Sequence, residues 1–186
     1  VQDIYKFDQR RIIVGRVESG VLTVGDSILF SPMNKVARVA TIENWTGFRN
    51  DLERKTEAAA GSCVGITLDD QIFVERGNVI SHTDSPFILT NVFRARLFWL
   101  GNKPLEVGSR YKLKINTAEY DVEVKEIEQV LNTDDLSLRP AEQVVKTSVA
   151  EVILKTRAMI AMDSAVKFMM SESMPSTRIV LRTGAP

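Results

Sequence analysis

Apolar and polar residues alternate along several short segments of this chain. Between Phe93 and Trp99 every second residue is apolar, and Arg94 and Arg96 occupy positions in between. Successive side chains of a β-strand point to opposite faces of a sheet, so this period of two predicts a strand with one buried face. Patterns with the period of a helix are scarce, and the chain is therefore expected to be all-β.

Further alternating segments extend this picture. Residues 111–115 and 120–124 both alternate, and they flank the polar stretch 116–119, which predicts a hairpin. Turn residues separate the other apolar runs. Strands are also predicted at 11–18, 26–31, 36–43, 63–68, 79–82, 147–156 and 178–182. Many short strands at regular spacing are typical of barrels and sandwiches.

One stretch without large apolar side chains divides the chain. It runs from Ser81 to Pro86, and we predict a linker there between two β domains, 1–83 and 87–186. A second polar stretch, Arg49–Lys55, is charged and lies between predicted strands. It is expected to be a solvated loop, since charge runs usually are.

The net charge of the chain limits the classes of partner that we expect it to bind. The 186 residues carry 24 basic and 24 acidic side chains, a net charge of zero. Residues 1–86 hold 10 basic and 12 acidic groups, and residues 87–186 hold 14 and 12. Nucleic acids are therefore unexpected partners, because phosphate binding needs a basic surface. No apolar stretch approaches the roughly 20 residues of a membrane span, and no secretory signal is recognised at Val1–Ile4.

The single cysteine lies in a motif that resembles a nucleophile elbow. Gly61-Ser62-Cys63-Val64-Gly65 has the form G-x-C-x-G, but an elbow needs a helix after the nucleophile, and residues 64–68 are strand-forming. The only histidine, His82, falls within the predicted linker, where it is expected to be solvated. Cys63 is therefore predicted to be a small buried core residue rather than a nucleophile.

Other chemical signatures are not found in the sequence. One cysteine and one histidine cannot build a zinc site, and no glycine-rich phosphate loop occurs. Asp69 and Asp70 are adjacent, so a strand would point them to opposite faces, and a strand-end turn is the favoured interpretation. No catalytic, cofactor-binding or metal-binding residue is predicted. Five methionines in the last third, from Met159 to Met174, are expected to fill core gaps or to form a soft partner surface.

Two phrases of the sequence nevertheless resemble a known family. "RIIVGRVESGVLTVGDSILFSP" (11–32) and "AAAGSCVGITLDDQIFVERGNVIS" (58–81) are similar to the second domain of the translation-factor superfamily of GTPases. In this interpretation Gly20 and Gly25 permit tight turns, and Gly77 suits a left-handed turn. Close approach at barrel corners is expected at Gly61 and Gly65.

Within that superfamily, "VQDIYKF" (1–7) and "GITLDDQIFVERG" (65–77) look most like the large subunit of GTP-dependent sulfate adenylyltransferase. Residues 93–135 resemble the start of the third domain. The resemblance implies two consecutive antiparallel six-stranded barrels that follow a GTPase domain, and this chain would then be a fragment without that domain. Family members continue past a strand like Arg178–Arg182, so the second barrel is expected either to lack its last strand or to close differently.

The resemblance also implies a function. The parent enzyme would make adenylyl sulfate and pyrophosphate from ATP and sulfate, driven by GTP hydrolysis. GTP and magnesium would bind the missing GTPase domain, a small subunit would catalyse adenylyl transfer, and these barrels would couple the two in the cytoplasm without a cofactor of their own. The alternative is the tRNA-binding barrel pair of an elongation factor of the Tu or 1-alpha type, which the neutral charge disfavours. A stand-alone enzyme is disfavoured by the missing chemistry.

Overall fold

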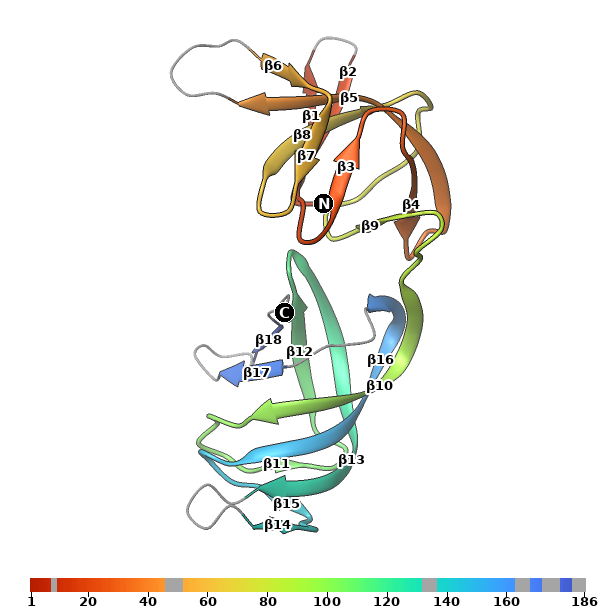
Figure 1. Cartoon of the computed structure of the whole chain (residues 1–186). Coiled ribbons are helices and arrows are strands. Elements are labelled where there is room, and N and C mark those ends of the chain that lie inside the picture. The colour runs from red at the N-terminus through yellow and green to blue at the C-terminus, as the bar shows by residue number, and fades with distance from the viewer. Residues whose placement is uncertain (8–9, 46–51, 132–136, 163–167, 172–177, 182–186) are drawn as a thin grey trace. The chain divides into compact units, whose positions relative to one another are not determined.

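The computed structural model describes residues 1–7, 10–45, 52–131, 137–162, 168–171 and 178–181. Within these residues the protein consists of strands, turns and loops, with no helix, as predicted. The described part accordingly offers no helix that could span a membrane. The chain divides into two compact units, essentially residues 1–87 and 88–184 (Figure 1).

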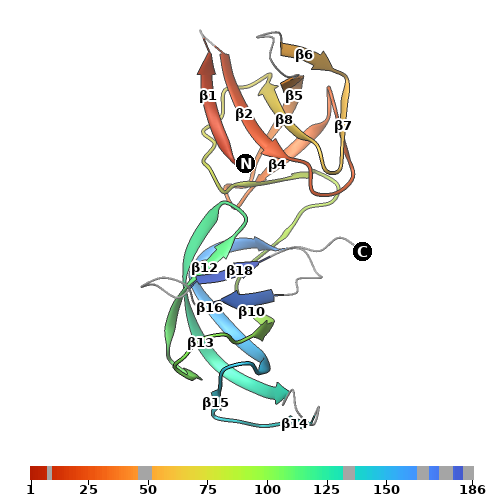
Figure 2. The same ribbon diagram turned by 90° about the vertical axis from the view of Figure 1, so that its left-hand side faces the viewer.

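The first unit is built on one large sheet and a small strand pair. The large sheet has the order β1-β2-β8-β5-β4-β9, with β6 on β5, and β3 pairs with β7. Its strands are β1 (Asp3–Phe7), β2 (Arg10–Arg16), β3 (Val21–Thr23), β4 (Ser27–Ser31), β5 (Lys35–Trp45), β6 (Leu52–Lys55), β7 (Glu57–Ala59), β8 (Cys63–Leu68) and β9 (Val79–His82). Figure 2 shows β1, β2 and β8 from a second side. Its core is formed by aliphatic side chains around the fully buried Ile28, Phe30 and Ile42.

The second unit has a sheet of its own. The strand order is β10-β16-β13-β12-β18-β17, with β14 on β13, and β11 pairs with β15. Its strands are β10 (Ile88–Phe98), β11 (Leu105–Glu106), β12 (Arg110–Ile115), β13 (Ala118–Leu131), β14 (Leu138–Arg139), β15 (Gln143–Val144), β16 (Val149–Met162), β17 (Phe168–Ser171) and β18 (Arg178–Leu181). The core includes Leu105, Leu113, Val124 and Leu154, each with no exposed surface.

The predicted alternation in β10 is confirmed. Every second residue from Phe93 to Trp99 is buried, with Phe93 the most exposed of them at 9%. The side chains of Arg94 and Arg96 are exposed. Trp99 packs in this core and also makes polar and aromatic contacts there. Its indole Nε1 donates a hydrogen bond to the carbonyl of Lys103 at 2.8 Å, and its ring meets Tyr111 edge to face. An aromatic polar atom is thus satisfied inside the core.

The predicted hairpin is also confirmed, with a tighter turn than the sequence indicated. Strands β12 and β13 pair antiparallel up to Ile115 opposite Ala118. The turn therefore comprises Asn116 and Thr117 alone, and Asn116 has a positive φ of 51°. Asparagine tolerates this conformation better than most residues, which lets the strands reverse in two residues.

The expectation of two six-stranded antiparallel barrels is met only at the coarser level of an all-β fold. The hydrogen-bonded pairs of the described residues form open sheets, with no pair that closes either one. One neighbour pair is parallel: β18 runs alongside β12, with Leu113 opposite Ile179. Hairpin patterns in the sequence predict antiparallel neighbours, whereas β12 and β18 are far apart along the chain.

Two expected loops contain strands. Ser81 and His82 lie in β9, which pairs with β4, so the predicted linker begins two residues too early. Polar residues can occupy a strand whose other face is covered, and here Ile80 packs on the core. In the charged stretch, Leu52–Lys55 forms β6 on β5, while residues 49–51 lie outside the described residues.

The two glycines near Cys63 have different roles. A Cβ atom at Gly65 would lie 2.6 Å from Cγ2 of Ile12 on the adjacent strand, so close approach is confirmed there. At Gly61 nothing lies within 4 Å of such an atom, and φ is +89°. The expected close approach at Gly61 is therefore wrong: the position requires a left-handed backbone conformation.

Candidate functional site

Cys63 is exposed, which corrects the prediction of a buried core residue. It begins β8 and pairs with Arg16 on β2. Val64 and Ile66 are buried, at 7% and 3% of their surface, and Cys63 and Val64 are consecutive in the strand. Because consecutive residues point to opposite faces, burial of Val64 turns the thiol outward.

His82 is exposed, as expected, but it lies at the end of β9 rather than in a linker, and it contacts neighbouring residues. Its Nε2 lies 3.1 Å from the carbonyl oxygen of Val21 and donates a hydrogen bond to it. Its Nδ1 lies 3.8 Å from Oδ2 of Asp26, and the side chain is 45% exposed. His82 thus fastens the end of β9 to the β3–β4 turn. The structure places Cys63 and His82 in β8 and β9, which are not neighbours in the sheet, so they form no nucleophile–base pair.

The acidic residues singled out in the sequence do not converge on a metal. Asp69 and Asp70 follow the end of β8 in an exposed bend, as the strand-end interpretation predicts. In the described part of the chain, no group of three or more histidine, cysteine, aspartate or glutamate side chains could hold an ion. Of the methionines, Met162 is 8% exposed and Met159 is 46% exposed, while the side chains of the later ones lie outside the described residues.

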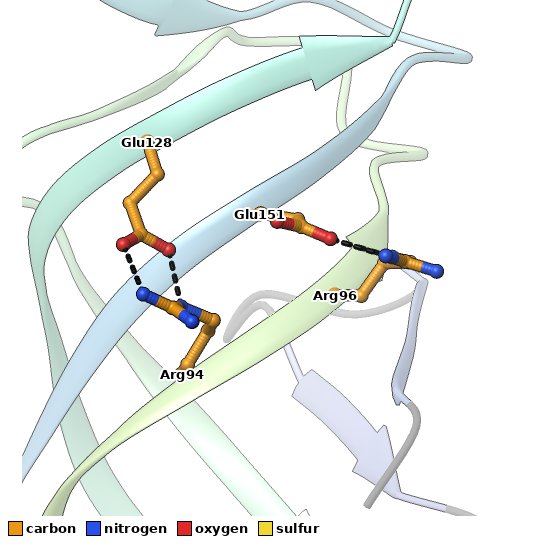
Figure 3. A network of polar contacts seen from close by, with 4 residues as sticks. All are labelled: Arg94, Arg96, Glu128 and Glu151. Atoms are coloured by element: carbon orange, nitrogen blue, oxygen red, sulfur yellow. Dashed lines mark hydrogen bonds and ion pairs between the residues drawn. The ribbon is translucent and has the colours of Figure 1, made fainter.

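Several ion pairs of the described residues lie on the outer face of the second unit's sheet, which we call the charge ladder. Arg94 on β10 reaches over the central strand β16 to Glu128 on β13, with nitrogen–oxygen distances of 2.6 and 2.7 Å (Figure 3). This is a two-bond fork, the strongest arrangement of a guanidinium and a carboxylate. Beside it, Arg96 on β10 contacts its cross-strand partner Glu151 on β16.

The ladder continues on the far side of β13. Lys112 lies opposite Asp121, and their charged atoms are 2.5 Å apart. The next rung pairs Arg110 with Glu123, which also binds Lys125. Opposite charges directly across a strand pair stabilise the pairing, so the register that buries the apolar face also matches the charges.

These contacts change the titration of the ladder. The hydrogen bond from Lys112 lowers the pKa of Asp121, and the hydrogen bond from Lys125 lowers the pKa of Glu123. The hydrogen bonds to Glu128 and Asp121, respectively, raise the pKa of Arg94 and of Lys112. Each of these four shifts, in Asp121, Glu123, Arg94 and Lys112, favours the charged form of the group, and each group lies beside one of opposite charge.

This arrangement determines what the face can bind. Phosphate groups are held by basic side chains that exchange counterions for the phosphate. On the ladder the arginines and lysines of these pairs already have carboxylate partners, so the face offers little net positive charge. It is suited to stabilising the sheet and to contact with a polar protein surface.

The sequence predicted the two arginines of the charge ladder on β10 but not the carboxylates that they bind. The alternation placed Arg94 and Arg96 on the outer face, but not their partners. Glu128 and Glu151 lie on strands that the chain reaches 34 and 55 residues later. Finding them requires the register of three strands, which depends on packing of the core.

Comparison with known proteins bears on the second unit first. Residues 92–182 match the family described as GTP-eEF1A C-terminal domain-like. This segment is a GTP-eEF1A C-terminal-like domain. The resemblance of residues 93–135 to the third domain of the translation-factor superfamily of GTPases is thereby confirmed.

Curated relatives extend the likeness to most of the chain. The chain is 30% identical to sulfate adenylyltransferase subunit 1 of Methylorubrum populi over 153 residues, which is 82% of this chain and 31% of the relative. It is 33% identical to sulfate adenylyltransferase subunit 1 of Shewanella oneidensis, over 72% of this chain and 26% of that protein. The chain therefore spans less than a third of the length of these relatives.

A solved structure supports the fold across both units. The structure of Sup35 in complex with GDP superposes with a TM-score of 0.74 at 21% sequence identity. It covers 87% of this chain and 39% of the Sup35 chain. At that identity the likeness is one of fold.

Proposed function

We propose that this chain is the non-catalytic β portion of the large subunit of a GTP-dependent sulfate adenylyltransferase. It would couple GTP hydrolysis in a separate GTPase domain to adenylyl sulfate synthesis from ATP and sulfate by a small subunit. The observation that carries the proposal is the identity of 30% with sulfate adenylyltransferase subunit 1 over 82% of the chain. The single unpaired cysteine is in keeping with the cytoplasm.

The chemistry of the described residues supports a binding role rather than a catalytic one. Cys63 and the single histidine, His82, lie on strands that are not neighbours in the sheet, and no group of acidic side chains within the described segments could hold an ion. A coupling domain needs surfaces that are fixed in shape and available to other proteins. The charge ladder provides such a surface, since each arginine fork is held by a carboxylate of the same sheet.

We also propose that each unit, 1–83 and 87–186, closes into a six-stranded barrel. In the second unit the two end strands of the sheet, β10 and β17, have Cα atoms within 8 Å of one another. In each unit six strands follow one another in an unbranched order, with one further strand attached to an inner one. Closure would remove the exposed edges that open sheets present.

A second candidate is the tRNA-binding barrel pair of an elongation factor. The family matched by residues 92–182 and the likeness to Sup35 favour it, because both belong to translation GTPases. The neutral charge and the paired basic residues of the ladder count against it, since tRNA binding requires basic side chains facing the phosphates.

Salt dependence separates the two candidates. The purified chain is titrated with the small subunit from the same organism and, separately, with aminoacyl-tRNA, at low and at physiological salt. We expect association with the small subunit that changes little with salt, because protein interfaces lose only the screening of rim charges. Submicromolar tRNA binding that persists at physiological salt would replace this proposal with the elongation-factor candidate.

A further inference from the structure

The sheet of the second unit is irregular at one point along β16. Lys155 and Ile160 lie opposite residues of β10 that are only two positions apart, so residues 156–159 face the single residue Asn91. Extra residues in one strand of an antiparallel pair form a bulge, and a bulge changes the direction in which side chains point. The side chains of the bulge therefore do not follow the alternation of the rest of β16.

The bulge is held by a buried side chain. Thr156 is 1% exposed, and its hydroxyl donates to the carbonyl of Ala158 at 2.8 Å and lies 3.4 Å from the carbonyl oxygen of Asn91. The next three residues, 157–159, are all exposed, whereas Ile160 has no exposed surface. Met159 is thus turned to solvent by an ordered element of the fold.

Met159 differs in this respect from the other methionines whose side chains the structure describes. It is 46% exposed, whereas Met162 on the same strand is 8% exposed and belongs to the core of the second unit. Met33 is partly buried and packs against the core of the first unit. A thioether is oxidised where an oxidant can reach its sulfur, so exposure decides which of these methionines reacts first.

We infer that Met159 is the site at which a peroxide modifies the second unit while it is folded. The sulfur of Met159 attacks one oxygen of hydrogen peroxide, the O–O bond breaks, and the other oxygen leaves as water after proton transfer. The sulfur is thereby oxidised to a sulfoxide, and the peroxide is reduced to water. This inference goes beyond the proposed function and does not depend on it.

The place of Met159 decides what the modification does to the fold. A sulfoxide is polar, and inside a packed core it would disrupt apolar contacts. At Met159 the added oxygen faces water, so the core of the second unit, which contains Met162, is left intact. Oxidation at this position therefore changes the surface of the protein and not its stability.

The experiment treats the purified chain with hydrogen peroxide and stops the reaction with free methionine. Mass spectrometry of proteolytic peptides then measures the sulfoxide at each methionine over time. Met159 is expected to react at least roughly tenfold faster than Met162 or Met33, because buried sulfur reacts only after local opening of the fold. In concentrated urea these rates should become similar.

Met159→Leu is the matched variant, since leucine keeps the size of the side chain and carries no sulfur. It should abolish the rapid oxidation of this peptide and leave Met162 and Met33 slow. The thermal midpoint of the wild type, measured when Met159 is oxidised and Met162 is not, should equal that of the untreated protein.

Equal rates at Met159 and Met162 in the folded chain would overturn the inference, since exposure would then not select the site. Protection of Met159 that disappears in urea would overturn it as well, because the side chain would be covered in solution. A clear fall of the thermal midpoint on selective oxidation of Met159 would show that its thioether stabilises the fold, and the conclusion that oxidation spares the core would be wrong.

Discussion

At the scale of single residues, five tight turns of this protein have the same geometry. Four of them have glycine at the third position. In each of the five, the amide of the fourth residue donates to the carbonyl of the first, and the third residue has a positive φ. This is the type II turn, which favours glycine at its third position. The third residues are Gly25, Gly61, Gly77, Gly108 and Thr147, with φ of 92°, 89°, 93°, 83° and 67°.

Thr147 is the strained member of the set. A β-branched side chain in the left-handed region costs about 1–2 kcal/mol, and asparagine tolerates it better. We expect Thr147→Asn to raise the free energy of unfolding of the second unit by roughly 1 kcal/mol. Its amide, which donates to the carbonyl of Trp99 at 2.7 Å, is retained. Urea unfolding monitored by circular dichroism measures the change.

The reciprocal substitution is the control. A Cβ atom at Gly108 would meet nothing within 4 Å, so Gly108→Thr adds backbone strain without a clash. It should destabilise the second unit by an amount similar to the gain from Thr147→Asn. A neutral effect of both substitutions would contradict the assignment of strain to the turn.

Residue-scale predictions from sequence succeeded where one residue type has one physical role. Turn glycines such as Gly25 and Gly77 were expected and have the positive φ that glycine permits. Cys63 was placed on the wrong side of its strand, because the expectation rested on how often cysteines are buried. The phase of the strand, fixed by Val64 and Ile66, was the better guide. Thr147 could not be found, since threonine is not typical of its turn position.

At the scale of strands, the charge ladder makes stability depend on pH. The pKa values of Asp121 and Glu123 are lowered in the folded protein from ordinary values of 3.8 and 4.5. A lowered folded pKa stabilises the fold above the unfolded pKa, and this contribution is lost as pH falls through the folded value. The second unit should therefore lose stability as pH falls through about 4.5 and below.

Asp121→Asn together with Glu123→Gln should flatten that pH dependence, because neither amide can titrate. Glu106→Gln, which removes an exposed carboxylate outside the ladder, should leave the slope as in the wild type. The measurement is the urea midpoint of the second unit between pH 3 and pH 6. Parallel slopes for the double variant and the wild type would show that the ladder does not couple to folding.

Strands were predicted well where alternation is strong, and their partners were not. The strands at 63–68 and 79–82 have the predicted bounds, and β10 has the predicted buried face. Alternation states which face of a strand is buried but not which strand lies beside it. The pairing of β18 with β12 depends on chain segments far apart, and short strands such as β11 and β15 are too brief to show a period.

At the scale of the whole molecule, the two units have separate cores. One core draws on residues 13–74 and the other on residues 93–162, with no member in common. Cores that share no side chains can unfold independently, so we expect two transitions rather than one. The predicted division of the chain near residues 83–86 can therefore be tested by counting the unfolding transitions.

Trp99 makes the test possible. It is 2% exposed in the core of the second unit, so in a Trp45→Phe background the fluorescence of the chain follows that unit alone. In the first unit, Gly65→Ala would force a Cβ atom against Ile12 at 2.6 Å, and overpacking of this kind costs roughly 1–3 kcal/mol. We expect this substitution to lower the temperature at which the first unit unfolds in a calorimetric scan. The midpoint of the Trp99 fluorescence change should stay where it is. Thr147→Asn should raise the midpoint of the Trp99 fluorescence change and leave the unfolding temperature of the first unit unchanged. If Gly65→Ala shifts the Trp99 midpoint as far as the calorimetric one, the two units unfold together, and the division into independent domains is wrong.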